Sequence, residues 1–147
     1  MHPMATEEKL VIKPVGRPQK EDVDTLVSWF LQAFDLSDEK KGLEPFMLKE
    51  IISGSRKGDG VTSKELNSKL EAPRTTVIYH LNRFIYSGLV VRKGRKYYLR
   101  SEDMESTLEE LQADMMREFQ RMMAMAEKLD EILEGDTHGR RKERRRR

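Results

Sequence analysis

Apolar residues recur along most of the chain at steps of three and four, which is the spacing of helices with one buried face. The helices predicted from this spacing cover residues 19–36, 44–53, 62–70, 73–87 and 102–134. Two short apolar runs, 89–92 and 96–99, flank Lys93-Gly94 and predict two strands joined by a tight turn. Val61 is expected to add a strand of one or two residues. The pattern therefore predicts a mainly α fold with a small β-hairpin.

Local sequence signals mark where these helices begin and end. Thr62 and Glu65 have the spacing of a capping box, and Pro73 suits the first turn of a helix. Glycine is the usual residue just after a helix, because it accepts a left-handed backbone conformation. The glycines expected to end the second, fourth and fifth helices are Gly54, Gly88 and Gly135.

The same pattern divides the chain into four parts. Residues 1–18 contain three prolines and are expected to form a flexible arm. Residues 19–100 are expected to form the folded domain, and residues 101–135 a single long helix. Residues 136–147 are too charged to pack and are expected to be a disordered basic tail.

Charge is strongly segregated, although the net charge of the 147 residues is only +2. Residues 54–100 carry 11 Lys/Arg against 3 Asp/Glu, and residues 140–147 carry 7 against 1. The two remaining segments are acidic, with 7 against 10 in residues 1–53 and 3 against 12 in residues 101–139. A basic middle and tail beside acidic flanks predict a face that binds a polyanion.

Several classes of protein are disfavoured by the composition. The absence of cysteine excludes disulfides, thiolate metal sites and cysteine nucleophiles. No run approaches the roughly 18 apolar residues of a membrane span, so we expect a soluble, cytoplasmic protein with no membrane contact. Three scattered histidines do not make a metal site, and no phosphate-binding glycine loop or nucleophile–base pattern is present. We therefore expect no metal, no cofactor and no enzymatic activity.

The helix over residues 73–87 has two distinct faces on a helical wheel. One face is apolar and comprises Val77, Ile78, Leu81, Phe84 and Ile85. The other face, with its flanks, carries side chains suited to bases and phosphates: Arg74, Thr75, Thr76, Tyr79, His80, Asn82 and Arg83. Such a helix fits the major groove of DNA, where Asn pairs with adenine and Arg with guanine. For His80 we expect packing or a phosphate contact rather than metal binding.

Further basic and polar residues precede and follow this helix. The hairpin carries Arg92, Lys93, Arg95 and Lys96, which we expect against the DNA backbone or the minor groove. At the start of the preceding helix, we expect phosphate contacts from Thr62, Ser63 and Lys64. The order of helix, turn, helix and basic hairpin predicts a winged helix-turn-helix.

The segment VTSKELNSKLEAPRTTVIYHLNRFIYSGLVVRKGRKYYLR, residues 61–100, resembles the winged helix-turn-helix of ArsR-like prokaryotic transcription regulators, particularly archaeal ones. Within it, HLNRFIYSGLV matches their HL-x-x-L-x-x-x-G-L-V pattern. The resemblance implies a sequence-specific regulator that binds double-stranded DNA. The chain departs from the family at Glu71, where many relatives have glycine, and in lacking the cysteines of metal-responsive relatives.

The long helix carries a second apolar pattern, which predicts a homodimer. Its apolar residues from Met104 to Leu133 follow heptad spacing with one stutter, between Met115 and Phe119. The residues expected at the dimer interface are Trp29, Phe30, Phe34, Leu108, Leu111, Met115, Phe119, Met122, Leu129 and Leu133. The methionines of the long helix would also suit a ligand pocket that adapts to different shapes. Packing in the core of the dimer interface is the preferred interpretation. Two copies would read half-sites about 34–36 Å apart.

The two ends of the chain leave alternatives open. KPVGRPQK, with Gly16-Arg17-Pro18 at its centre, resembles an AT-hook, but Val15 replaces the usual arginine and a plain linker is the alternative. The tail from Arg140 to Arg147 is a possible further nucleic-acid contact. A nucleoid-associated protein is compatible with these features.

A different class of function also fits the pattern. The chain could be a winged-helix protein-interaction module, or a nucleoid- or RNA-associated adaptor, that uses its long helix and basic tail. Changes at Asn82 and Arg83 separate the two interpretations, because only a DNA-reading protein would lose site preference.

Overall fold

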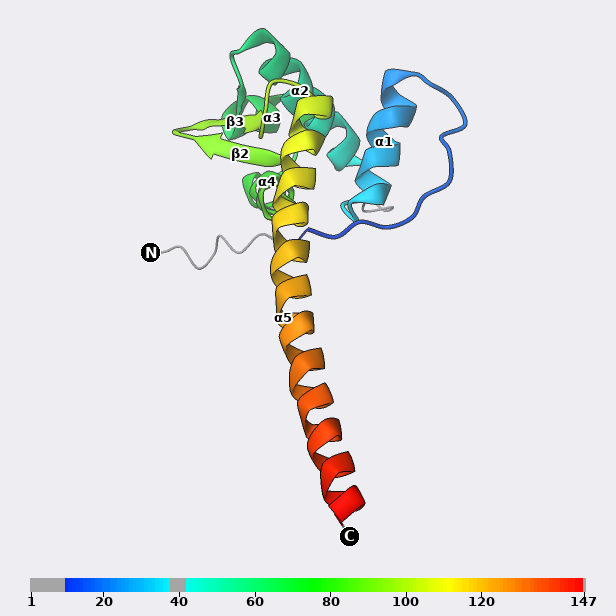
Figure 1. The fold of residues 1–147 in the computed structure, drawn as a ribbon. Helices are drawn as coiled ribbons and strands as arrows, with labels where there is room; N and C mark the ends of the chain where they lie inside the picture. Colours follow the sequence, from blue (N-terminus) through cyan, green and yellow to red (C-terminus); the bar gives the residue numbers. More distant parts are fainter. Residues whose placement is uncertain (1–9, 38–41, 147) are drawn as a thin grey trace. The chain divides into compact units, whose positions relative to one another are not determined.

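The computed structural model describes residues 10–37 and 42–146, with side chains up to residue 136. These residues form two compact units that divide between Glu110 and Leu111. The described part is mainly helical, with a small antiparallel sheet and a long C-terminal helix, which confirms the predicted fold at this level (Figure 1). In chain order the elements are α1 (Val23–Ala33), α2 (Leu43–Lys57), β1 (Val61–Thr62), α3 (Ser63–Leu70), α4 (Arg74–Tyr86), β2 (Val90–Lys93), β3 (Lys96–Leu99) and α5 (Met104–Arg146).

The sheet has three antiparallel strands in the order β1-β3-β2. Strands β2 and β3 form the predicted hairpin, in which Val90 pairs with Leu99 and Lys93 with Lys96, so the turn is Gly94-Arg95 and not the predicted Lys93-Gly94. Gly94 turns the chain with φ +63°, a left-handed conformation that glycine adopts without strain. The strand of one or two residues predicted at Val61 is confirmed as Val61–Thr62, and it pairs along the other edge of β3.

Apolar side chains of α1 to α4 and of the sheet form the core of the first unit. Its fully buried members include Leu31, Met47, Leu48, Ile51, Leu66, Val77, Leu81, Phe84, Leu89 and Leu99. Each such side chain contributes about 1.5–3 kcal/mol through removal of apolar surface from water. The apolar face predicted for residues 73–87 therefore anchors α4, and its opposite face remains toward solvent.

The capping signals before α3 act as the sequence predicts. The backbone N–H of Glu65 donates to Oγ1 of Thr62 at 3.1 Å, and the N–H of Thr62 donates to the Glu65 carboxylate at 3.5 Å. Helix α3 ends at Glu71, which takes a left-handed conformation with φ +53°. Glu71 thus has the backbone that glycine favours, despite its side chain.

Two predicted helix ends are wrong. Helix α2 continues through Gly54 to Lys57 and stops at Gly58, whose φ is +84°. Gly54 is helical, and its missing side chain makes room for the carbonyl oxygen of Gly60, since a Cβ would lie only 2.9 Å away. Helix α5 likewise passes Gly135 and continues to Arg146, so the backbone of residues 136–146 of the predicted disordered tail is helical, and residue 147 lies outside the described part. A glycine inside a helix costs only about 1 kcal/mol, and the Arg- and Lys-rich residues that follow favour helix.

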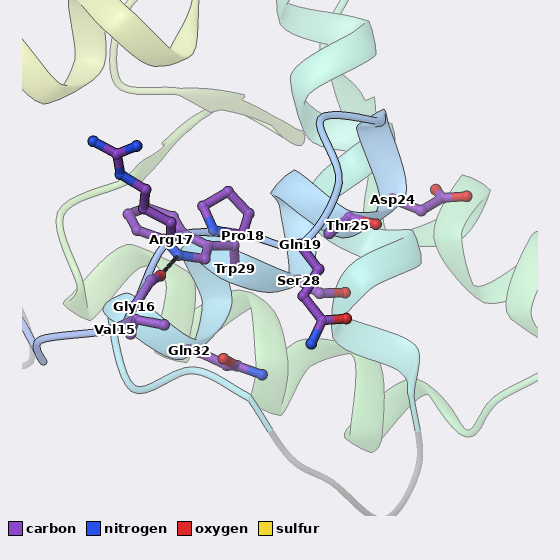
Figure 2. Close-up of a pocket in the computed structure, with 10 residues that line it drawn as sticks. All are labelled: Val15, Gly16, Arg17, Pro18, Gln19, Asp24, Thr25, Ser28, Trp29 and Gln32. Carbon is purple, nitrogen blue, oxygen red and sulfur yellow. Dashed lines mark hydrogen bonds between the residues drawn. The ribbon is translucent and has the colours of Figure 1, made fainter.

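The segment before α1 also differs from the prediction of a flexible arm. Residues 1–9 lie outside the described part, whereas residues 10–18 are tied to α1 and the residues after it. The N–H of Lys13 donates to the carbonyl of Ala33 at 2.7 Å, and its ammonium pairs with Asp35 at 2.7 Å. The indole N–H of Trp29 donates to the carbonyl of Gly16 at 2.6 Å (Figure 2).

Within the described residues, no helix has both the length and the apolar character needed to cross a membrane.

Candidate nucleic-acid interface

Helix α4 presents a polar and aromatic face to solvent. Arg74, Thr75 and Asn82 are exposed, and the Tyr79 side chain is 52% exposed. Thr76 is half-buried on the flank of this face. A phenol, an amide and a hydroxyl on one open helical face can exchange hydrogen bonds with base edges. The same groups can donate hydrogen bonds to phosphate oxygens.

Arg83 lies at the edge of this face and is held by the protein itself. Its Nη2 donates to the backbone carbonyl of Asp35 at 2.8 Å, and its guanidinium lies 5.9 Å from the centre of the Tyr79 ring. The hydrogen bond and charge of Lys13 lower the pKa of the Asp35 carboxyl, with a smaller contribution from Arg83. Arg83 therefore links α4 to the end of α1, and a base contact would require it to leave this position.

His80 is not on the exposed face, so of the two roles expected for it, packing fits the structure and a phosphate contact does not. It is 4% exposed, and its Nε2 lies 3.3 Å from Oε1 of Glu44, itself 1% exposed. The helical wheel places His80 on the flank of the apolar stripe, where a buried partner draws it inward. That partner comes from α2, 36 positions earlier in the chain, and no local pattern predicts it.

The β2–β3 hairpin exposes all four of its predicted basic residues, Arg92, Lys93, Arg95 and Lys96. Two of them lie over tyrosine rings of β3. The guanidinium of Arg92 is 5.6 Å from the ring centre of Tyr97, and the ammonium of Lys93 is 5.4 Å from that of Tyr98. Tyr97 and Tyr98, which directly follow Lys96, were not singled out from the sequence, but their rings support the cationic side chains of the hairpin.

The tip is also braced by the backbone. Nε of Arg92 donates a hydrogen bond to the carbonyl of Gly94 at 2.9 Å, which ties the Arg92 side chain to the backbone of the turn. A cationic side chain fixed in this way loses less conformational entropy when it meets a phosphate.

The start of α3 adjoins the hairpin through the sheet. Thr62 pairs with Lys96 across β1 and β3, and α3 packs against α4. Of the three predicted phosphate contacts, Lys64 is exposed, Ser63 is half-buried, and Thr62 already accepts the capping hydrogen bond. Thr62 keeps its hydroxyl proton for donation. The structure thus brings together α3, α4 and the hairpin, within a segment of 11 basic and 3 acidic residues.

A separate pocket of about 550 Å³ lies between residues 15–19 and α1 (Figure 2). Arg17, Gln19, Ser28 and Gln32 line it together with Trp29. The Gly16-Arg17-Pro18 core, compared above with an AT-hook, forms one wall of this pocket. Entry of that core into a minor groove would require breaking the Trp29 hydrogen bond.

The predicted dimer residues fall into three groups by exposure. Phe34 and Leu111 are buried in a single copy of the chain, at 7% and 4% exposure, so their prediction as interface residues is wrong. Half-buried positions are Trp29, Phe30, Leu108 and Met115. The exposed positions are Phe119, Met122, Leu129 and Leu133, each more than half exposed.

Comparison with protein-family models, with curated proteins and with solved structures gives no match. Among the described residues, no group of three or more His, Asp or Glu is arranged to hold a metal ion. Function is therefore inferred from the geometry and charge of the chain itself.

Proposed function

We propose that this chain is a sequence-specific transcriptional regulator that binds double-stranded DNA as a homodimer. In this proposal residues 61–99 act as a winged helix-turn-helix, with α3 and α4 as the helix pair and the β2–β3 hairpin as the wing. Helix α4 enters the major groove, and the wing lies on the backbone or in the minor groove.

The observation that carries the proposal is the joint exposure of two features in one basic segment. The polar face of α4 is open to solvent, and so are all four cationic side chains of the adjoining hairpin. Arg92 and Lys93 lie over tyrosine rings at a tight turn, whereas the cationic side chains of an ordinary solvated surface are not ordered in this way. Cationic side chains that are ordered at the narrow tip of a hairpin can bind the phosphates of a DNA backbone.

The residues of the face have separable roles in this proposal. Asn82 and Thr75 contact base edges, whereas Arg74, Tyr79 and Lys64 contact phosphates. Arg83 positions α4 through Asp35 in the free protein.

The exposed apolar residues of α5 support the homodimer. Phe119, Met122 and Leu129 are 54–63% exposed at heptad spacing, which is costly for an isolated helix in water. Two copies related by a two-fold axis would present two α4 helices to half-sites separated by one helical turn of DNA or a multiple of it.

The proposal is tested by fluorescence anisotropy on labelled duplex DNA across a range of salt concentrations. The informative variant changes Arg92, Lys93, Arg95 and Lys96 to glutamine, which removes the charge and keeps the carbon chain that covers Tyr97 and Tyr98. Each lost phosphate contact should reduce the log–log salt slope by about 0.9, so four contacts reduce it by about 3.6 for each copy bound, or about 7 for the dimer.

A matched control removes four positive charges elsewhere, at Lys20, Lys49, Arg121 and Lys128. It has the same net charge as the hairpin variant and should keep most of the wild-type slope. Equal slopes for wild type and hairpin variant, or no binding of wild type to duplex at low salt, would sink the proposal. An adaptor function would then be the better interpretation.

A further inference from the structure

The pocket between residues 15–19 and α1 has the size of a small-molecule binding site, with a volume of about 550 Å³. Proteins bind small organic ligands in pockets of about 300–1,000 Å³, where apolar walls supply contact area and a few polar groups fix the orientation. This pocket has walls of both kinds. Its main apolar surfaces are the rings of Pro18 and Trp29, and its polar side chains are Arg17, Gln19, Asp24, Thr25, Ser28 and Gln32 (Figure 2).

Two contacts hold the Trp29 ring in place beside the pocket. Its indole N–H donates a hydrogen bond to the carbonyl of Gly16 at 2.6 Å, and its ring meets that of Phe30 edge to face, with 5.1 Å between the ring centres. Trp29 and Pro18 are both half-buried, so the protein covers only part of their apolar surfaces. A tryptophan that is ordered before binding offers a planar ring a stacking surface at little cost in conformational entropy.

The net charge of the pocket lining comes from Arg17. The two charged side chains of the lining are Arg17 and Asp24, which lie at opposite ends of the pocket in Figure 2. Asp24 pairs with the ammonium of Lys49 at 2.9 Å, so its negative charge is already balanced. Arg17 is exposed and has no ion-pair partner among the residues that the structure describes. One unbalanced guanidinium matches a ligand with a single negative charge, and its planar fork fits a carboxylate.

Between these two ends, the lining offers hydrogen-bond donors and acceptors without charge. Thr25, Ser28 and Gln32 follow one another at steps of three and four, so they share the face of α1 that lines the pocket. Hydroxyl and amide groups both donate and accept hydrogen bonds. They therefore suit polar substituents on a ring, such as a hydroxyl or an amide group.

We propose that this pocket binds a small aromatic carboxylate. The carboxylate pairs with Arg17, the ring lies against Trp29 and Pro18, and the uncharged side chains of α1 bind further substituents of the ring. The Gly16-Arg17-Pro18 core then belongs to a small-molecule site and not to a minor-groove contact. None of these side chains is among those proposed to contact DNA, so this inference and the proposed function stand or fall separately.

Fluorescence titration of the full chain without DNA tests the site. Trp29 is the only tryptophan of the 147 residues, so selectively excited tryptophan emission reports on this pocket. The probe is benzoate, which consists of the ring and the carboxylate alone. We expect a saturable change in emission with a dissociation constant on the order of 1 mM, because benzoate is a small ligand. The absence of a saturable change up to roughly 50 mM would overturn the proposal.

Two further probes separate the ring from the charge. Benzamide keeps the ring and replaces the carboxylate with a neutral amide, whereas acetate keeps the carboxylate and lacks the ring. Each should bind at least about 3-fold more weakly than benzoate, because each loses one of the two contacts. Equal binding of acetate and benzoate would show that the pocket does not recognise a ring, and equal binding of benzamide and benzoate that it does not recognise the charge. Either result would overturn the proposal.

The variant Arg17→Gln removes the positive charge from the pocket, and Lys20→Gln is the matched control. Both side chains are exposed, so both variants should unfold in urea like the wild type, but only Arg17 lines the pocket. Arg17→Gln should weaken benzoate binding about 3- to 10-fold and leave benzamide binding unchanged, whereas Lys20→Gln should leave both within about 2-fold of wild type. Equal effects of the two variants on benzoate would show that the anion responds to overall charge and not to this site, which would overturn the proposal.

Discussion

At the scale of single residues, Glu71 is the clearest conflict between side chain and backbone. Its φ of +53° lies in the left-handed region, which costs a residue with a side chain roughly 1–2 kcal/mol. Glycine avoids this cost but loses about 0.5–1 kcal/mol through its freer unfolded chain. Glu71→Gly should therefore stabilise the protein by about 0.5–1 kcal/mol in urea unfolding. Glu71→Ala keeps the Cβ and should give no such gain, and equal effects of the two changes would contradict the interpretation.

The buried pair of His80 and Glu44 gives a second prediction at this scale. Removing one partner of a buried polar contact leaves the other unsatisfied and typically costs about 1–3 kcal/mol, or more where the remaining group is charged. His80→Leu and Glu44→Leu should each destabilise strongly, while the double variant should cost less than the sum of the two. Urea unfolding of the four proteins of this double-mutant cycle measures the coupling, and strict additivity would show that the two side chains do not interact.

The same pair shows what the sequence can and cannot predict for individual residues. Periodicity correctly separates Val77, Leu81 and Phe84 from Thr75 and Asn82, because burial of one helical face is a local property. It fails for His80 and Arg83, whose partners Glu44 and the Asp35 carbonyl lie 36 and 48 positions away. Contacts between distant segments depend on the packing of whole elements, which periodicity within one helix does not determine.

At the scale of elements, two glycines near the end of α2 serve different purposes. Gly58 and Gly60 both have left-handed backbones, with φ of +84° and +68°. A Cβ on Gly58 would meet nothing within 4 Å, whereas a Cβ on Gly60 would lie 2.7 Å from the ring of Tyr98. Gly58→Ala should cost about 1–2 kcal/mol, from backbone strain alone.

Gly60→Ala should cost more than Gly58→Ala, because overpacking typically adds about 1–3 kcal/mol. Gly58→Ala is the matched control, since both changes add one methyl group to a left-handed glycine of the same loop. Thermal or urea unfolding measures the difference. Equal costs would show that Tyr98 moves aside, and that the loop does not depend on its close approach to β3.

Helix ends follow the sequence where the signal is a side chain, but at only one of the three predicted glycines: Gly88, with φ +87°, follows the end of α4 as predicted. The Thr62–Glu65 capping box forms as predicted because both of its hydrogen bonds are made within four residues. Gly54 and Gly135 do not end their helices, because glycine permits a left-handed turn without requiring it. Glycine is therefore the weaker boundary signal in this chain.

Two aspartates at helix starts predict how stability depends on pH. Hydrogen bonds from Thr25 lower the pKa of Asp22 below its ordinary value of 3.8, and hydrogen bonds from Ser106 lower that of Asp103. A lowered pKa in the folded state means that the charged form stabilises folding above pH 3.8. That stabilisation is lost as the pH falls through the lowered values.

The variant Asp22→Asn with Asp103→Asn should therefore be less sensitive to acid. Asparagine caps helices as well as aspartate but does not titrate, so the loss of stability between pH 5 and pH 2 should be smaller than in the wild type. Urea unfolding at several pH values measures this loss. The control is Asp24→Asn with Asp59→Asn, which removes two carboxylates that do not cap a helix. If both variants show the same dependence of the free energy of unfolding on pH, the cap explanation is refuted.

At the scale of the whole molecule, the proposed functions divide between parts of opposite charge. The basic segment 54–100 contains the face proposed for DNA, and the acidic residues of α5 keep most of that helix from phosphates. If α5 joins two copies, each copy brings one DNA-binding face, and the affinity for long DNA depends on both faces acting together. Dimerisation should then matter for long duplexes and not for short ones.

This dependence gives the last prediction. Met122→Glu with Leu129→Glu places charge on the exposed stripe of α5 and should prevent dimerisation without touching α4 or the hairpin. The wild type should bind a duplex of about 60 base pairs more than about 10-fold tighter than one of about 15, because the second face binds at high effective concentration. The variant should bind both duplexes with the wild-type affinity for the short one. The variant Glu127→Gln with Lys128→Gln, charge-neutral overall and outside the heptad core, should behave as wild type. If the double-glutamate variant keeps the preference for long DNA, the stripe does not join the two DNA-binding faces, and α5 must serve a different partner.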